Sequence, residues 1–243
     1  MELGRANAYS HHAMKRHLHR AFHWLRRFDL VLLMGVLLVV SGGWAFVQVL
    51  DEVQDGDTKH FDQWVIDSMQ GARDNKVMLD VARDITALGG VTVLTLFTAG
   101  VVGFLWIEKK YHALVLLLVS TLGACILTFV LKDFIDRDRP DPLGHLAYTL
   151  TKSFPSGHAS LSAAVYLTLG TLLARLTVNR WLKVYFIVMA MLLTGLVGVS
   201  RVFLKVHWPT DVLAGWSLGL MWAILCWSVA RWLQHRGKVE QAV

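Results

Sequence analysis

Three clusters of ionisable and small polar residues flank long apolar stretches of this sequence. In the first, Lys132-Asp-Phe-Ile-Asp-Arg-Asp-Arg139-Pro140, two cations stand seven residues apart. Seven residues make two helical turns, so Lys132 and Arg139 face the same side if a helix continues through both. A guanidinium fork beside an ammonium suits a multiply charged oxyanion. The alternative is a pair of snorkelling anchors, cations at a helix end whose tips reach the surrounding water.

The second cluster is Phe154-Pro155-Ser156-Gly157-His158, directly before an apolar stretch. Proline and serine indicate the start of a helix, and glycine lets a ligand approach the backbone closely. The free N–H groups of such a helix start, together with Ser156 and Gly157, form a natural seat for a phosphate group. His158 then lies in the first turn and can donate a proton to a leaving oxygen. The alternative is an ordinary capped helix with an interfacial histidine.

The third cluster, Ser200-Arg201-Val-Phe-Leu-Lys-Val-His207-Trp208-Pro209-Thr210-Asp211, adds a cation, an imidazole and a carboxylate. His207 and Asp211 are four residues apart, so one helical turn brings the carboxylate to the imidazole. A carboxylate in that place sets the tautomer of the ring and raises the basicity of its other nitrogen, which is how nucleophiles are activated. The alternative is a lone interfacial histidine. The presence of Arg201 and of the two other clusters counts against it.

Uncharged blocks of the sequence predict the elements that position these clusters. The chain is 55% hydrophobic, with a mean hydropathy of +0.47, and a helix needs about 20 apolar residues to cross a membrane. Six blocks have this length or reach it by including flanking residues: 30–50, 85–107, 111–131, 159–174, 184–200 and 212–230. We therefore predict an all-α fold, a polytopic membrane bundle of six transmembrane helices. The first block is too long for the core of a signal peptide and lacks a cleavage site after it, so we expect a retained span.

The distribution of charge predicts how this bundle is oriented, because cytoplasmic loops are enriched in Lys and Arg. With both termini in the cytoplasm, the cytoplasmic segments carry 14 of the 24 Lys and Arg residues but only 4 of the 18 Asp and Glu residues. All three polar clusters then lie at the outer, extracytoplasmic ends of the spans. The net charge of +6 does not indicate a nucleic-acid partner, because the charges lie in short segments between apolar blocks.

The six spans are predicted to form one domain, residues 30–232. Two segments outside this domain and one loop within it are predicted to have roles of their own. Residues 1–29 form a basic amphipathic leader suited to an anionic membrane face, and its five histidines offer no closed ligand set for a metal. Residues 233–243 form a cytoplasmic tail. Residues 51–84 carry nine acidic and four basic residues, with apolar residues at helical spacing. This pattern predicts two short amphipathic helices on the outer surface, acting either as a connector or as a gate for substrate.

In order along the chain, the three clusters spell Lys-x6-Arg-Pro, Pro-Ser-Gly-His and Ser-Arg-x5-His-x3-Asp. This pattern resembles the type 2 phosphatidic acid phosphatase (PAP2) family, which shares its site with soluble bacterial acid phosphatases and vanadium haloperoxidases. All three motifs match in full over residues 132–211, and the six predicted spans extend the similarity to most of the chain.

The resemblance implies a phosphatase site that needs no metal or other cofactor, with a role for each matched residue. His207 would attack phosphorus and form a phosphohistidine, with Asp211 orienting the ring. His158 would protonate the leaving oxygen and then activate water. The phosphoryl oxygens would be held by donors from all three motifs: Lys132, Arg139, Ser156, Gly157 and Arg201. Arg137 lies in a stretch that is often basic in the family, so we expect it to contact a headgroup or a second phosphate.

The resemblance leaves the substrate and the oligomeric state open. It implies a membrane lipid phosphate, such as phosphatidate, phosphatidylglycerol phosphate or undecaprenyl pyrophosphate, hydrolysed at the outer face of a bacterial inner membrane. Segments 51–84 and 141–153 are the expected places for substrate selection. There are three alternatives. A vanadium haloperoxidase is disfavoured by the six spans and the small chain, whereas a lipid-to-lipid phosphotransferase would use the same site. A catalytically silent lipid-binding or transport protein is disfavoured because His158, His207 and Asp211 are all present.

Overall fold

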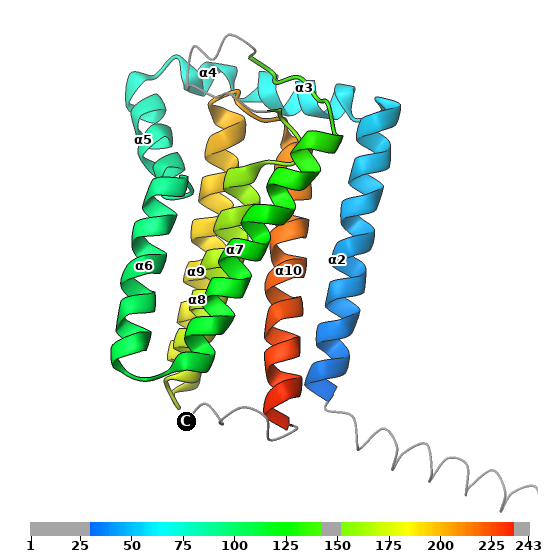
Figure 1. Cartoon of the computed structure of the whole chain (residues 1–243). Helices are drawn as coiled ribbons and strands as arrows, with labels where there is room; N and C mark the ends of the chain where they lie inside the picture. The colour runs from blue at the N-terminus through cyan, green and yellow to red at the C-terminus, as the bar shows by residue number, and fades with distance from the viewer. Residues whose placement is uncertain (1–29, 142–151, 236–243) are drawn as a thin grey trace, which may run out of the picture.

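The fold is a bundle of long helices that run side by side, with shorter helices across one end (Figure 1). The computed structural model describes residues 30–141 and 152–235, and every regular element in these two ranges is helical, as predicted. Five helices are long and apolar enough to cross a membrane: α2 (Leu30–Asp55), α7 (Tyr111–Phe134), α8 (Gly157–Arg175), α9 (Arg180–Phe203) and α10 (Pro209–His235). The predicted leader and most of the predicted tail lie outside the described residues.

The second predicted span, 85–107, lies in a bent pair of helices and not in one continuous helix. α5 (Lys76–Ala87) and α6 (Val91–Ile107) meet at an angle of 44° across a short break. The break contains two consecutive glycines, which disfavour a continuous helix. At Gly89 a Cβ atom would lie 2.3 Å from Cγ1 of Val197 on α9, so glycine allows the break to pack against that helix. The described residues therefore contain five single-helix spans, and six spans if the bent pair counts as one.

Segment 51–84 contains three short helices, whereas its sequence predicts two. α2 runs into the segment, and Gly56 then turns the chain with a φ of 84°, which glycine adopts without strain. α3 (Lys59–Ser68) crosses the end of the bundle and is followed by α4 (Gln70–Arg73). α5 begins after Asn75, whose side chain caps its N-terminus, and it packs along α9. Periodicity alone does not reveal that the last of these helices bends into the bundle.

Helix α8 lies at the centre of the bundle and packs against α7, α9 and α10. At Gly219 of α10 a Cβ atom would lie 2.3 Å from the carbonyl oxygen of Ser160, so these two helices approach backbone to backbone. Hydroxyl groups between α7 and α8 are paired, with Ser120 and Thr168 2.7 Å apart and Thr128 and Ser160 2.9 Å apart. Such pairing is what buried hydroxyls need in an apolar interior.

Large apolar side chains cover the outward faces of the long helices. Leu37 on α2, Leu96 on α6, Ile126 on α7 and Val184 on α9 are each more than half exposed. An apolar surface of this extent is unfavourable in water but matches the hydrocarbon of a lipid bilayer. Together with the length of the helices, it identifies the chain as a multi-pass membrane protein.

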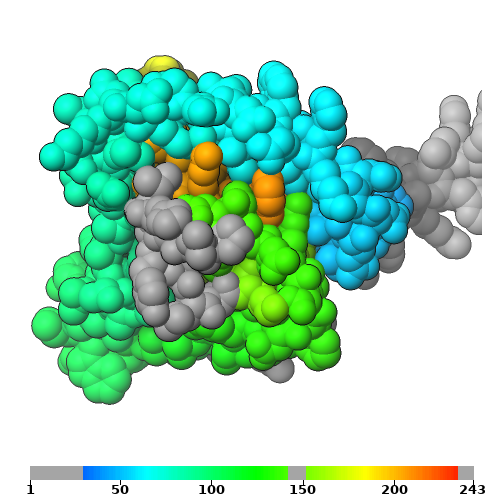
Figure 2. Space-filling model, turned by 90° about the horizontal axis from the view of Figure 1, so that it is seen from above, coloured from blue at the N-terminus to red at the C-terminus, as the bar shows by residue number. Residues whose placement is uncertain are grey.

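The end of the bundle that α3 crosses, called the α3 end below, is where α7 and α9 finish and α8 and α10 begin (Figure 1). Seen from this end, α3 to α5 form one rim of the surface, and the orange turn before α10 shows between this rim and the green end of α7 (Figure 2). The three polar clusters therefore meet at one end of the bundle, although they are up to 79 residues apart in sequence.

Candidate active site

The turn between α9 and α10 brings His207 and Asp211 together. Lys205 turns the chain with a φ of 53°, and α10 begins at Pro209, a residue preorganised for the first position of a helix. The Oδ2 atom of Asp211 accepts a hydrogen bond of 2.9 Å from the backbone N–H of Trp208, the contact by which an acid in the first turn caps its helix. The same oxygen lies 3.4 Å from Nδ1 of His207. The predicted one-turn spacing therefore places the carboxylate beside the imidazole.

The carboxylate of Asp211 is completely buried and is held by further donors. The hydroxyl of Ser153 donates to Oδ2, and Nη1 of Arg137 donates to Oδ1 at 2.5 Å. Buried charge is tolerated only with such partners. Nothing in the sequence marks Ser153 as a partner of Asp211, because the two residues meet only through the return of a loop to α10.

His207 is 2% exposed and has a different neighbour at each ring nitrogen. Nδ1 faces Asp211, and Nε2 lies 3.3 Å from Nη1 of Arg139. Burial lowers the pKa of His207 from 6.5 to about 3; the hydrogen bond with Asp211 opposes this shift, and Arg201 and Arg139 add to it. The imidazole is therefore neutral at neutral pH. With its proton on Nδ1, toward Asp211, it presents the lone pair of Nε2 to the cations.

Lys132 and Arg139 converge, but not in the way that their seven-residue spacing predicts. α7 ends at Phe134 and the chain continues without helical structure, so the two residues do not share a helix face. They meet instead at the backbone of Lys152, whose carbonyl oxygen accepts hydrogen bonds from Nζ of Lys132 (2.6 Å) and Nη2 of Arg139 (3.2 Å). Arg139 also donates to the carbonyl oxygen of Val206 at 2.5 Å, beside His207. Burial lowers the pKa of Arg139 and Asp211 opposes this shift, but a guanidinium stays protonated.

Arg137 contacts protein carboxylates and does not point its guanidinium at a free headgroup position. Its Nη1 atom lies 2.5 Å from Asp211 and 2.9 Å from Thr210, and its Nη2 atom lies 2.7 Å from Asp62 on α3. The expectation of a headgroup contact for Arg137 is therefore not supported by its geometry. Asp136, the residue before Arg137, forms an ion pair with the exposed Lys152.

Ser156 precedes the first residue of α8, as the sequence predicts, but its side chain does not cap the helix. Its backbone N–H donates to the carbonyl oxygen of Asp211 at 3.0 Å, which ties the start of α8 to α10. The Ser156 hydroxyl is fully buried and has no hydrogen-bond partner in the described part of the chain. It is thus available to a ligand, as are the first backbone N–H groups of α8 from Gly157 onward.

Arg201 and His158 form the side of the site that faces the break between α5 and α6. Arg201 is 4% exposed; its Nη1 donates to the hydroxyl of Thr86 at 3.0 Å, and its Nε finds no partner among residues 30–141 and 152–235. His158 packs on the break, because a Cβ atom at Gly89 would lie 3.4 Å from its Cδ2. Arg201 and His207 both interact electrostatically with His158. The sequence did not predict that the break between α5 and α6 borders the site, and the paired glycines were the only signal of it.

The eight residues predicted from the three clusters thus gather at one place. Lys132 has Arg139 and Arg201 as like-charged neighbours, and attraction to Asp211 opposes this repulsion. Two buried donors, the Ser156 hydroxyl and Nε of Arg201, have no partner within the described chain. A tetrahedral oxyanion bound beside Nε2 of His207 would neutralise the cations and satisfy both donors.

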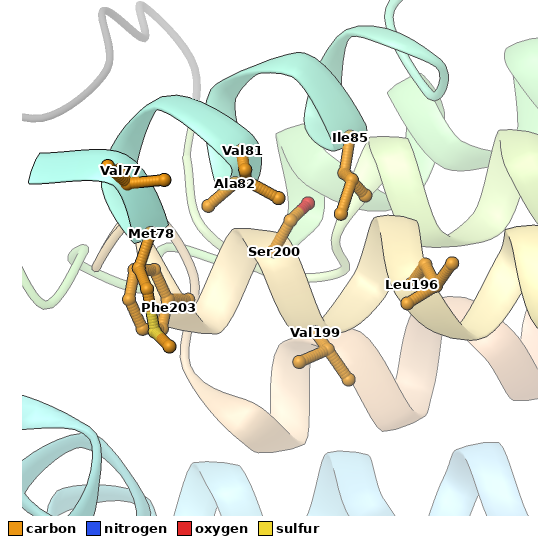
Figure 3. A pocket seen from close by; sticks show the side chains of 9 residues that line it. All are labelled: Val77, Met78, Val81, Ala82, Ile85, Leu196, Val199, Ser200 and Phe203. Atoms are coloured by element: carbon orange, nitrogen blue, oxygen red, sulfur yellow. The ribbon is translucent and has the colours of Figure 1, made fainter. Parts of the chain in front are cut away.

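An apolar groove lies between α5 and α9 beside this polar site (Figure 3). Its volume is about 390 Å³, and nine residues line it: Val77, Met78, Val81, Ala82, Ile85, Leu196, Val199, Ser200 and Phe203. Ser200 directly precedes Arg201, and Ile85 directly precedes Thr86, the hydrogen-bond partner of Arg201. Each wall of the groove therefore contains a residue that is directly adjacent in sequence to a residue of the polar site.

The sequence profile of the PAP2 superfamily matches residues 113–235, half of the chain, and the match contains all eight predicted site residues. The chain belongs to the PAP2 superfamily. The family resemblance that the three motifs predict is thereby confirmed, and with its phosphatase relatives it makes this PAP2 protein a phosphoric ester hydrolase.

Relatives of this PAP2 protein include enzymes with different lipid substrates. It is 37% identical to phosphatidylglycerophosphatase B of Bacillus subtilis over 145 residues, 58% of this chain and 70% of that enzyme. It is 36% identical to an undecaprenyl-diphosphatase of Sulfolobus acidocaldarius over 108 residues, 42% of this chain and 48% of that enzyme. The crystal structure of a transmembrane PAP2-type phosphatidylglycerolphosphate phosphatase from Bacillus subtilis matches with a TM-score of 0.74 at 28% identity, covering 84% of this chain and 98% of that one.

Proposed function

We propose that this chain hydrolyses a phosphate ester or diphosphate of a membrane lipid through a phosphohistidine on His207. The observation that carries the proposal is the two-sided environment of that ring. Its Nδ1 atom faces a buried carboxylate, and its Nε2 atom faces a cluster of cations with unpaired donors. A neutral nucleophile, a group that orients it and donors for developing negative charge are what covalent phosphoryl transfer requires.

In the first step, the lone pair of His207 Nε2 attacks phosphorus and the bond from phosphorus to the lipid oxygen breaks. His158, in the first turn of α8, enters this step as an imidazolium, gives one proton to the leaving oxygen and becomes neutral. The proton on Nδ1 of His207 stays in place, so the phosphorylated ring is cationic and is stabilised by Asp211 at 3.4 Å. In the second step, His158 takes a proton from water, the water oxygen attacks phosphorus, and the bond from phosphorus to Nε2 breaks. Inorganic phosphate leaves and His207 is neutral again.

During both steps, the phosphoryl oxygens are held by Lys132, Arg139 and Arg201 together with the Ser156 hydroxyl and the first backbone N–H groups of α8. The support for this role is the convergence of like charges and the two unpaired buried donors. The three cations are already held in place by protein contacts: Lys132 and Arg139 donate to the carbonyl oxygen of Lys152, and Arg201 donates to Thr86. Preorganised donors stabilise the transition state without reorganisation when charge develops.

The substrate we propose is a lipid, because an apolar groove lies next to residues of the polar site. The groove between α5 and α9 offers an acyl or prenyl chain an apolar surface (Figure 3), and one of its lining residues, Ser200, directly precedes Arg201. The relatives support the same class, since phosphatidylglycerophosphate and undecaprenyl diphosphate are both lipid phosphates. We propose that segment 51–84 and residues 141–153 select between these headgroups. Residues 142–151 lie outside the described residues.

The proposed orientation places both termini in the cytoplasm and the α3 end outside, at the outer leaflet of a bacterial inner membrane. The support is the balance of charge in the described residues: the α3 end carries ten Lys and Arg residues against fourteen acids, whereas the opposite end carries one acid, Glu108, and six cations, Lys109, Lys110, Arg175, Arg180, Lys183 and Arg231. In this arrangement 30–232 is the phosphatase domain, 1–29 lies on the inner membrane face and 233–243 is a cytoplasmic tail.

The test is phosphate release by the purified protein in detergent with EDTA, using phosphatidate, phosphatidylglycerol phosphate and undecaprenyl pyrophosphate in parallel. At least one lipid should yield inorganic phosphate, and His207→Ala should release none while keeping its helical content. Wild-type turnover by His207→Ala would contradict the proposed nucleophile. Transfer of labelled phosphate to an added lipid, in place of water, would identify a phosphotransferase that uses the same site.

A further inference from the structure

One acidic residue of segment 51–84 differs from all the others in its environment. Eight of the nine carboxylates of this segment are exposed, whereas Asp62, in the first turn of α3, is completely buried. Asp62 lies outside the three motifs of the site, more than 60 residues before the first of them. A fully buried carboxylate is unfavourable unless it is paired and hydrogen-bonded, so its partners indicate what it holds in place.

The partners of Asp62 are the N-terminus of α10 and Arg137. Oδ1 accepts the backbone N–H of Thr210 at 3.0 Å, and Oδ2 accepts the Thr210 hydroxyl at 2.8 Å. Asp62 thus acts as a capping acceptor for α10, supplied by another helix, at a helix end that favours negative charge. Oδ2 also accepts a hydrogen bond from Nη2 of Arg137 at 2.7 Å.

Arg137 joins this carboxylate to the one in the active site. Its Nη2 atom binds Asp62 while its Nη1 atom binds Asp211 at 2.5 Å, so the two nitrogens of one rigid fork hold two different acids. The guanidinium also lies over the ring of Trp208, 5.7 Å from its centroid. A continuous set of contacts therefore runs from α3 through Arg137 to Asp211, and from there to Nδ1 of His207.

We propose that Asp62 and Arg137 are positioning residues of the active site, through which α3 fixes the orientation of Asp211 and His207 for attack on phosphorus. The proposal rests on the function proposed above. It assigns to segment 51–84 a part in the chemical step, beyond connection or gating. Their contacts described above are with each other and with Thr210, Trp208 and Asp211, so their loss should slow the chemical step and leave substrate binding unchanged.

The experiment compares kcat and KM for the lipid phosphate that the wild-type protein hydrolyses best. Asp62→Asn keeps an acceptor for Thr210 but removes the charge, and Arg137→Lys keeps the charge but cannot bridge two carboxylates. Outer partners of active-site groups typically contribute about 10- to 100-fold to activity, so each variant should lose about that factor in kcat with KM within about twofold. The matched control is Asp80→Asn on α5, which removes an exposed acid from the same segment and breaks its ion pair with Arg83; kcat should not change.

The double variant separates positioning from mere support of the fold. If Asp62 acts through Arg137, Asp62→Asn with Arg137→Lys should lose no more kcat than the worse single variant, because both act on one unit. A structural role alone would lower the melting temperature and the active fraction, yet leave kcat per active enzyme unchanged, and would overturn the proposal. If the losses in kcat of the two single variants multiply in the double variant, the proposal is overturned as well. If Asp62→Asn does not fold, Arg137→Lys alone must show the loss in kcat.

His207→Ala, measured in the same series, separates the two proposals. Activity in His207→Ala would refute the proposed function itself. Loss of activity in His207→Ala together with wild-type kcat in folded Asp62→Asn and Arg137→Lys would overturn only the positioning role.

Discussion

The Nδ1 atom of His207 lies 3.4 Å from Oδ2 of Asp211, and the carboxylate is not free to turn away from the ring. The hydroxyl of Ser153 and the backbone N–H of Trp208 hold the same oxygen, and Arg137 holds the other. This fixed acceptor keeps the imidazole proton on Nδ1 and leaves Nε2 as the nucleophilic atom.

Replacing Asp211 with asparagine should therefore lower activity because His207 adopts the wrong tautomer, and not because substrate binding is lost. The amide can donate to Nδ1, which would move the ring proton to Nε2 and block attack. We expect kcat to fall by roughly 10⁴-fold, the loss seen when the orienting aspartate of a serine protease is changed in this way. Steady-state phosphate release measures the change, with helical content as the control for folding. A loss below tenfold would contradict the proposed role of Asp211.

Arg201→Gln should weaken stabilisation of the transition state, because it removes a buried cation and an unpaired donor from the phosphate site. Removal of one donor to developing negative charge typically costs about 10²- to 10³-fold in kcat, and we expect a loss in this range. Inhibition by inorganic phosphate should weaken as well. Arg83→Gln, which removes an exposed cation on α5, is the control and should change neither quantity. Equal effects of the two substitutions would mean that Arg201 has no specific place in the site.

The lowered pKa of His207 can be observed directly. Burial lowers it from 6.5 to about 3, and a base with a lowered pKa stays deprotonated to lower pH, so the ring should be neutral throughout the range from pH 5 to 8. The measurement is ¹⁵N NMR of histidine-labelled protein in detergent micelles, with His207→Gln identifying the signal. A constant neutral shift with the proton on Nδ1 is expected. A titration midpoint at or above pH 6 would contradict it.

Filling the groove between α5 and α9 should impair long-chain substrates selectively. Val81→Trp places a large ring in the groove, where we propose that a hydrocarbon chain lies. Burial of each CH₂ group contributes about 0.8 kcal/mol, so loss of a few of them should raise KM about tenfold or more for a long-chain lipid phosphate. A short-chain, water-soluble phosphate should be unaffected. Val93→Trp, on the exposed face of α6 away from the groove, is the matched control. An equal response to both chain lengths would exclude the groove as the chain site.

The parts of this structure that sequence predicts are those that depend on local composition. Uncharged blocks mark the spans because hydrocarbon excludes charge over a fixed length. The motif residues lie at the ends of those spans, so their meeting follows from the topology. Even there, the shared helix face expected for Lys132 and Arg139 is wrong, because α7 ends at Phe134 and spacing alone does not show where a helix stops.

Other features could not be predicted because they arise from contacts between distant segments. Asp62 looks like any other acid in a segment that has nine, and its partner Thr210 lies 148 residues away. Ser153 gains its role only when its loop returns to α10. The break between α5 and α6 leaves the apolar character of the block intact, so hydropathy does not reveal it.

The most direct test of the account is to trap the phosphorylated enzyme. Wild-type protein is mixed with a ³²P-labelled lipid phosphate in EDTA, denatured in alkali within the first turnover and digested for peptide mapping. We expect label on His207, stable in alkali and released in acid, as is typical of a phosphohistidine, and no label in His207→Ala. Label on another residue, or full turnover by His207→Ala, would contradict it.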